Sequence, residues 1–210
     1  MFERITEYFE KTMPNPQPEL HYSNAFELLV AVMLSAQCTD KRVNTITPAL
    51  FNAFPTPKIM AEASTDEIYQ LIKSCSYPNS KSKHLSDMSK MLHEKYDGQI
   101  PDDIDEMQKL PGVGRKTANL VAAVAFNKQT MPVDTHVFRV AARLGLSKNS
   151  STPLETERQL VKGFKKEILS KAHHWLILHG RYVCTARNPK CHECGLNGLC
   201  KKSLKASIGK

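Results

Sequence analysis

The 210-residue sequence predicts an all-α protein. Apolar residues recur at intervals of three and four along most of the chain, which is the pattern of helices with one buried face. Alternating β-branched residues, which would indicate strands, are scarce. Helix-start signals also recur, with Ser, Thr, Asp or Asn placed just ahead of the apolar pattern. Together these observations favour helices throughout the chain.

The composition indicates a globular protein with one large domain or two small ones. The longest nearly apolar run, residues 26–36, is too short to cross a bilayer, and the charged N-terminus has no secretory signal, so we expect a cytoplasmic protein, associated with the nucleoid in a bacterium. The net charge of +8 comes from 29 Lys and Arg against 21 Asp and Glu. This balance suits a polyanionic partner, and equally a basic protein with no nucleic-acid role.

Three helices are expected before residue 55. The first covers residues 2–13 and ends before the proline-rich segment "MPNPQP". The second begins near Ser23 or Asn24, with Glu27 placed to return a capping bond, and runs through residue 37. The third follows Thr39 and covers residues 41–54, interrupted by a proline.

The middle of the chain predicts three more helices. Residues 64–75 open with Ser64 and Glu67 in capping-box spacing. Residues 79–96 form a longer helix that is closed by an Asp-Gly pair. Residues 101–110 form a short helix that leads into the segment "LPGVGRKTA", which begins as a turn and continues as an apolar helix.

Three helices are expected after that one. An amphipathic helix follows Asp134 in "VDTHVFRVAARLGL". The next has a cap, an N1 proline and an N3 glutamate at Thr152, Pro153 and Glu155. The last covers residues 170–184, and its histidines are expected to be buried and hydrogen-bonded, because four cysteines nearby already complete a metal site.

The turn in "LPGVGRKTA" is built to approach a ligand closely. Pro111 fixes one dihedral angle, while Gly112 and Gly114 permit positive φ. The amides of Val113, Gly114 and Arg115 would then point outward beside a helix N-terminus, an arrangement that binds phosphate without selecting a base. A plain helix corner, in which the glycines serve only geometry, is the alternative. The full string resembles the helix-hairpin-helix motif of DNA repair enzymes.

Lys116 stands at the start of the following helix, where a cation is usually disfavoured. A lysine attacks a sugar carbon only as the free amine, and both a helix N-terminus and partial desolvation favour that neutral form. Asp134 is either a simple helix cap or a carboxylate that stabilises a cationic sugar. The hairpin, Lys116 and the segment around Asp134 together resemble the endonuclease III family of helix-hairpin-helix DNA glycosylases.

That resemblance covers essentially the whole chain and implies an architecture and an activity. It implies two lobes. The first is a helical-barrel lobe at residues 18–128, which contains the helix-hairpin-helix at about 104–123. The second lobe is formed by residues 1–17 and 129–210. It implies a bifunctional DNA glycosylase/AP lyase that removes oxidised pyrimidines and nicks the strand by β-elimination. Lys116 would be the Schiff-base nucleophile, Asp134 the catalytic carboxylate, and Gln37 the residue that fills the gap left by the flipped nucleotide.

The C-terminal cysteines form a separate motif with the spacing C-x6-C-x2-C-x5-C, at Cys184, Cys191, Cys194 and Cys200. Four thiolates suit zinc or an iron–sulfur cubane, and the single short knuckle favours the cubane. The resemblance implies a [4Fe-4S] cluster held by residues 184–200.

Arg187 and Lys190 lie between the first two of these cysteines. They would either meet a DNA backbone or simply solubilise an exposed loop.

The implied partner is double-stranded DNA that contains damaged bases or abasic sites, bound by a monomer. Two other functions stay open: a monofunctional adenine-mismatch glycosylase, whose members lack the lysine at position 116, and a non-enzymatic hairpin protein that binds DNA structure. The chain departs from the family at Ser76, Tyr77, Pro78 and Asn79, where glycine and two bulky residues commonly precede the asparagine. Tyr77 would either wedge the opposite strand or pack into the core.

Overall fold

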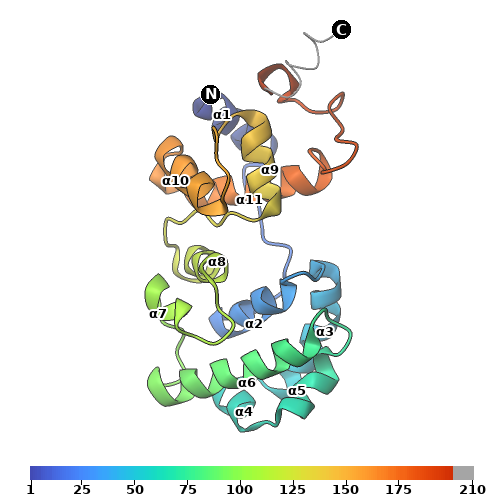
Figure 1. The fold of residues 1–210 in the computed structure, drawn as a ribbon, viewed down its shortest axis with the longest axis vertical. Coiled ribbons are helices and arrows are strands. Elements are labelled where there is room, and N and C mark those ends of the chain that lie inside the picture. The colour runs from blue at the N-terminus through green and yellow to red at the C-terminus, as the bar shows by residue number, and fades with distance from the viewer. Residues whose placement is uncertain (201–210) are drawn as a thin grey trace. The chain divides into compact units, whose positions relative to one another are not determined.

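The computed structural model describes residues 1–200, and within this range every regular element is a helix (Figure 1). The all-α prediction is therefore confirmed. The helices of the first half are α1 (Phe2–Thr12), α2 (Ala25–Ser35), α3 (Asp40–Ala53), α4 (Pro57–Glu62), α5 (Thr65–Ile72), α6 (Pro78–Lys95) and α7 (Ile104–Gln108). The later helices are α8 (Arg115–Phe126), α9 (Thr135–Leu144), α10 (Pro153–Gly163) and α11 (Leu169–Tyr182), with short 3-10 helices η1 (Lys166–Ile168) and η2 (Asn197–Leu199).

The expected capping residues begin the helices. Asn24 accepts a hydrogen bond from the Glu27 amide at 3.0 Å at the start of α2. Ser64 and Glu67 form a complete capping box at the start of α5. Each cap satisfies amide groups that a helix leaves without internal partners, so the position of the helix start is fixed locally.

Several helix ends differ from the sequence prediction by one to three residues, and one helix was not predicted. Helix α2 ends at Ser35, two residues early, because the Ala36 backbone leaves the helical region with ψ 112° and Gln37 follows in the left-handed region with φ 56°. Helix α4 was not predicted, although Thr56 caps it and Pro57 occupies its first turn. The early end of α2 leaves Gln37 in a turn rather than on a helix face.

The chain divides into two compact units. One, which we call the hairpin unit, is continuous and covers Pro18–Asn127. The other, which we call the cluster unit, joins Met1–Gln17 to the chain from Lys128 onward. Each unit has its own hydrophobic core.

Helix α2 is the centre of the hairpin unit. Its residues from Phe26 to Leu34 are all buried except Glu27, and it packs against α3, α6 and α8 (Figure 1). In the cluster unit the ring of Phe9 from α1 stacks on Trp175 from α11, with ring centroids 5.6 Å apart. The Trp175 indole also donates a hydrogen bond to the Met13 carbonyl at 2.7 Å, which ties the N-terminal segment to α11.

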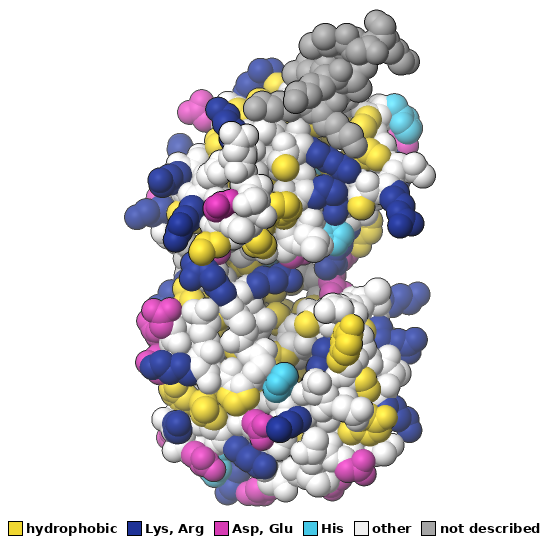
Figure 2. Space-filling model, viewed as in Figure 1, with side chains coloured by type: hydrophobic (Ala, Val, Ile, Leu, Met, Phe, Trp, Pro, Cys, Tyr) yellow, Lys and Arg dark blue, Asp and Glu magenta, His cyan; other side chains and the backbone are white. Residues whose placement is uncertain are grey.

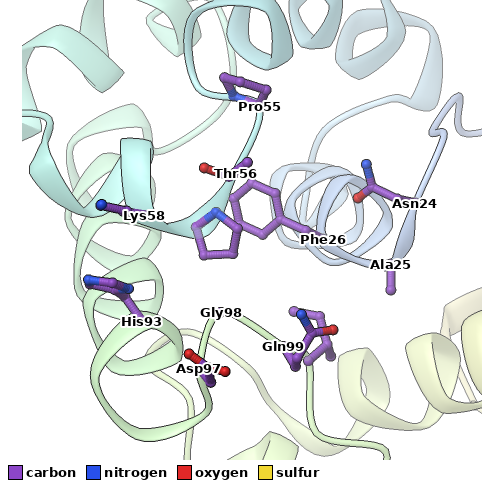
Figure 3. A pocket seen from close by; sticks show the side chains of 12 residues that line it. Asn24, Ala25, Phe26, Pro55, Thr56, Lys58, His93, Asp97, Gly98 and Gln99 are labelled. Atoms are coloured by element: carbon purple, nitrogen blue, oxygen red, sulfur yellow. The ribbon is translucent and has the colours of Figure 1, made fainter.

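A pocket opens in the hairpin unit between the start of α2, the start of α4 and the turn after α6 (Figure 3). Phe26, Thr56, Lys58, His93 and Asp97 are among the residues around it. None of the expected site residues lines this pocket. Within residues 1–200, no helix combines the length and the apolar character that crossing a membrane requires.

Candidate active site

In the hairpin between α7 and α8, the backbone conformation requires glycine at one of the two glycine positions but not at the other. Gly112 adopts φ 77°, and a Cβ there would lie 2.8 Å from the Cβ of His84 and 2.9 Å from the Met33 Cε. Gly114 instead has an ordinary extended backbone with φ −87°, and a Cβ there would meet open space. Of the two glycines that permit positive φ, only Gly112 adopts it.

The hairpin amides also differ from one another. The Val113 amide donates to the Leu110 carbonyl at 3.1 Å, and the Val113 side chain is only 5% exposed. The expectation of an outward amide is wrong for Val113, whose role is to close the turn and anchor it in the core. Gly114 and Arg115 are exposed at the N-terminus of α8. This end of the hairpin carries the partial positive charge of the helix.

Lys116 is the second residue of α8, and its side chain is exposed. The Lys116 amine was expected to be partly desolvated, and in the protein without DNA it is not. Its expected position at a helix N-terminus is confirmed. An exposed lysine at this position can reach a bound ligand without rearrangement of the hairpin.

Asp134 begins α9 in the other unit. Its Oδ1 accepts hydrogen bonds from the amides of His136 and Val137, both at 2.8 Å. The buried side chains of Val133 and Val137 fix the backbone on either side of this half-buried carboxylate. Asp134 is thus a helix cap, and because both bonds reach the same oxygen, the structure gives the carboxylate a fixed orientation.

Gln37 and Tyr77 lie at the tips of two exposed turns of the hairpin unit. Gln37 follows α2 and Tyr77 precedes α6, and both side chains are exposed. Tyr77 is 63% exposed, so the alternative in which it packs into the core is wrong.

The four C-terminal cysteines surround one small cavity of the cluster unit. The cavity is lined by Cys184, Cys191, Cys194 and Cys200, and all four thiols are free of disulfides. Within residues 1–200 no three His, Cys, Asp or Glu side chains lie close enough together to hold a single metal ion. Four free thiols that line one cavity are the donor set that a [4Fe-4S] cluster requires.

Two side chains support this cavity, of which the sequence analysis did not single out the first, Arg143. Arg143 of α9 donates to the Cys184 Sγ at 3.3 Å and to the Thr185 carbonyl at 2.7 Å. His179 of α11 lines the cavity, with its Nε2 3.7 Å from the Cys194 Sγ. Burial lowers the pKa of His179 to about 4, so its imidazole is neutral at physiological pH. Such outer contacts orient thiolate ligands and tune their charge.

The other two histidines of α11 are buried and hydrogen-bonded. The Nδ1 atoms of His173 and His174 lie 2.8 Å from the carbonyls of Pro132 and Ser170. The expectation that these two side chains are buried and hydrogen-bonded is confirmed.

The loop between Cys184 and Cys191 exposes Arg187 and Lys190. The Thr185 hydroxyl donates to the Arg187 carbonyl at 2.6 Å, and the Lys190 amide donates to the Val183 carbonyl at 3.0 Å. The loop is therefore closed by its own hydrogen bonds, while the two cationic side chains face solvent.

Comparison with known proteins identifies the family. Residues 30–166 match the HhH-GPD superfamily of base excision DNA repair proteins, and residues 184–200 match the iron–sulfur binding domain of endonuclease III. The chain is 48% identical over 198 residues to endonuclease III of Rickettsia felis, covering 94% of this chain and 92% of that protein. The chain belongs to the endonuclease III family.

Other endonuclease III proteins agree with this assignment. The chain is 47% identical over 192 residues to the Bacillus subtilis protein, covering 91% of this chain and 88% of that one. The solved structure of a trapped endonuclease III–DNA covalent intermediate matches with a TM-score of 0.93 at 42% identity, covering 99% of both chains. As a member of this family, the protein is a base excision DNA glycosylase with AP lyase activity, and it has a [4Fe-4S] cluster.

The positive charge of this endonuclease III family member is concentrated in one unit. The cluster unit has 18 Lys and Arg against 8 Asp and Glu, whereas the hairpin unit has 11 against 13. Lys and Arg side chains are nevertheless distributed over the face shown in Figure 2. The cluster unit therefore carries the excess positive charge that favours a polyanionic partner, whereas the hairpin unit is slightly acidic.

Purified protein should be brown and contain about four iron and four acid-labile sulfide atoms per chain, because a cubane on four thiolates has that composition. Replacing Cys191 with Ser should reduce iron content, solubility and DNA binding more than it alters the chemistry of the remaining active protein. Elemental analysis and the visible spectrum test both statements, and a colourless protein with one zinc per chain would contradict them.

Proposed function

We propose that this endonuclease III family member excises oxidised pyrimidines from duplex DNA, with Lys116 as the nucleophile and Asp134 as the charge-stabilising carboxylate. The observation that carries the proposal is the position of Lys116, exposed at the second residue of α8 directly after the hairpin turn. A hairpin that binds a phosphate would place the sugar of a neighbouring nucleotide within reach of this amine.

The reaction follows from the chemistry of a primary amine at a sugar carbon. The Lys116 Nζ forms a bond to C1′, and the bond from C1′ to the base breaks with its electrons leaving on the base. Ring opening gives an imine between Lys116 and the sugar. Loss of a proton from C2′ then expels the 3′ phosphate oxygen and nicks the strand. Asp134 stabilises the positive charge that develops on the sugar as the base departs.

The remaining side chains bind DNA rather than react with it. Gly114 and Arg115 at the start of α8 would bind a phosphate, with Gly112 permitting the turn and Val113 holding it. Gln37 would enter the gap left by the flipped nucleotide.

The cluster unit would supply further phosphate contacts through Arg187 and Lys190, on a loop that the [4Fe-4S] cluster holds in place. We further propose that the protein acts as a monomer. We propose a cytoplasmic location, because its DNA substrate lies there.

An adenine-mismatch glycosylase is the closest alternative, and Lys116 argues against it, because that group lacks the lysine. A non-enzymatic DNA-binding protein is the other alternative. Incubation with duplexes containing thymine glycol or a preformed abasic site separates the three functions. We expect both duplexes to be nicked. The proposal would be overturned if neither duplex were nicked. Excision of adenine from a mismatch would then indicate the mismatch glycosylase, and binding without any reaction would indicate the non-enzymatic protein.

Changing Gly114 to Asp should weaken binding to every duplex sequence alike, without loss of stability. The added Cβ meets open space, and Asp is favourable at the N-cap position that Gly114 occupies, so the fold is retained. The new negative charge, however, repels the phosphate that the hairpin would bind. Gly114→Asn is the matched control, because it adds the same bulk and cap without the charge.

Binding titrations over a range of salt concentrations measure this effect. We expect affinity to fall about tenfold for Gly114→Asp, with a shallower salt dependence, and much less for Gly114→Asn. Equal affinities of the two variants for DNA would show that the hairpin does not contact the DNA phosphates.

A further inference from the structure

A buried lysine joins two turns of the hairpin unit. Lys81, in the first turn of α6, is only 7% exposed. Its Nζ donates hydrogen bonds to the carbonyls of Leu34 and Ala36, both at 2.7 Å. These carbonyls lie at the end of α2, where helix carbonyls lack internal partners and carry partial negative charge. Lys81 therefore caps α2 from a different helix.

The same amine extends to Gln37 through a hydroxyl. Lys81 Nζ donates to the Ser76 Oγ at 3.3 Å, and this hydroxyl donates to the Gln37 carbonyl at 2.7 Å. Cys75 adds another bond between the two segments, from its Sγ to the Leu34 carbonyl at 3.3 Å. Burial is the main cause that raises the pKa of the Cys75 thiol, which keeps it protonated as a donor.

The bonds to the backbone carbonyls all run from residues 75–81 to residues 34–37. Each of the two segments includes an exposed tip in a strained conformation. Gln37 has φ 56° and Tyr77 has φ 54°, although neither is glycine. A non-glycine residue in the left-handed region is strained and persists only where its surroundings fix it. The bonds from Lys81 and Ser76 are the surroundings that fix these two turns.

We propose that Lys81 and Ser76 are positioning residues that hold the Gln37 and Tyr77 turns as one rigid, two-pronged element that enters the DNA stack. This inference rests on the proposed function, because it assumes that Gln37 fills the gap of a flipped nucleotide. A side chain held in place before binding loses less conformational entropy when it enters, so more binding energy is available to unstack the bases.

Ser76→Ala tests the element with the least disturbance, because it removes one hydroxyl from a half-buried site. Ser35→Ala is the matched control, since the Ser35 hydroxyl donates to the Val32 carbonyl within α2 at 2.9 Å and joins no second segment. The readout is the fluorescence of 2-aminopurine placed opposite a tetrahydrofuran abasic analogue in a duplex. This signal reports unstacking and requires no catalysis.

We expect wild-type protein and Ser35→Ala to raise the fluorescence equally, and Ser76→Ala to give about half that rise at saturation. Excision of thymine glycol from a duplex should slow about fivefold in Ser76→Ala, the usual effect of losing one hydrogen bond. Nicking of a preformed abasic site in single-stranded DNA should not change, because no stack has to be entered. A purely structural role would lower both rates together.

Lys81→Met is the stronger variant, because it leaves two carbonyls without their donor, and its excision rate should fall at least about tenfold. If this variant does not fold, as judged by circular dichroism, Ser76→Ala decides alone. Equal fluorescence in Ser76→Ala and Ser35→Ala, or no rise with the wild type, would overturn the inference. Wild-type protein that unstacks the duplex without excising thymine glycol would instead overturn the proposed function and leave the rigid element standing.

Discussion

Lys116→Gln should abolish the covalent complex that borohydride traps between the protein and DNA containing an oxidised pyrimidine. The amide fills similar space, but its nitrogen lone pair is delocalised into the carbonyl and does not attack C1′, so no imine forms and borohydride has nothing to reduce. Specific binding should be largely retained, because the proposed phosphate contacts come from the hairpin backbone and the exposed Lys116 side chain is not part of the buried core. Trapping on a denaturing gel measures the first effect, and titration with an uncleavable duplex measures the second.

Lys109→Gln is the control for this experiment. Lys109 is also exposed, next to the hairpin, and its charge is paired with Glu106. We expect this variant to be trapped as efficiently as the wild type. Efficient trapping by Lys116→Gln would show that a different amine attacks the sugar.

Asp134→Asn should slow excision of the base by about a hundredfold to a thousandfold, the range seen when a group that stabilises developing charge is removed. The fold should be unchanged, since the side-chain oxygen of Asn accepts the same bonds from the amides of His136 and Val137. Single-turnover kinetics on a thymine glycol duplex measure the rate. Nicking of a preformed abasic site should slow less, because no base has to leave.

Asp134→Ala separates the cap from the charge. This variant loses both, so its melting temperature should fall by an amount corresponding to about 1 kcal/mol, whereas Asp134→Asn should melt with the wild type. Both variants should excise slowly. Wild-type excision by a stably folded Asp134→Asn protein would leave Asp134 as a structural cap only.

The parts of the fold that local signals determine could be predicted from the sequence. Caps such as Ser64 with Glu67 act within a few residues, so the helix starts follow from the sequence. The end of α2 could not be predicted, because Lys81 and Ser76, about forty residues away, stabilise the turn at Gln37. The same holds for Arg143, which contacts the cysteine loop across 41 residues of sequence.

The hairpin shows both the strength and the limit of motif analysis. The motif predicted a turn between two helices, and Gly112 has the positive φ that such a turn needs. The motif did not distinguish Gly112 from Gly114, or the Val113 amide from its neighbours, because those differences depend on contacts with His84 and Met33 and on one bond inside the turn.

The division of the cluster unit into two segments has a consequence for synthesis on the ribosome. The chain begins with α1, whose Ile5 and Phe9 are buried in a core completed by Trp175 and Leu196. The hairpin unit lies between these segments and is continuous, so it can fold as it emerges. At about 5–20 residues per second, α1 waits about 10–40 s with its apolar face uncovered before its partners are made. In the nascent chain, α1 is therefore the helix whose apolar face stays exposed longest.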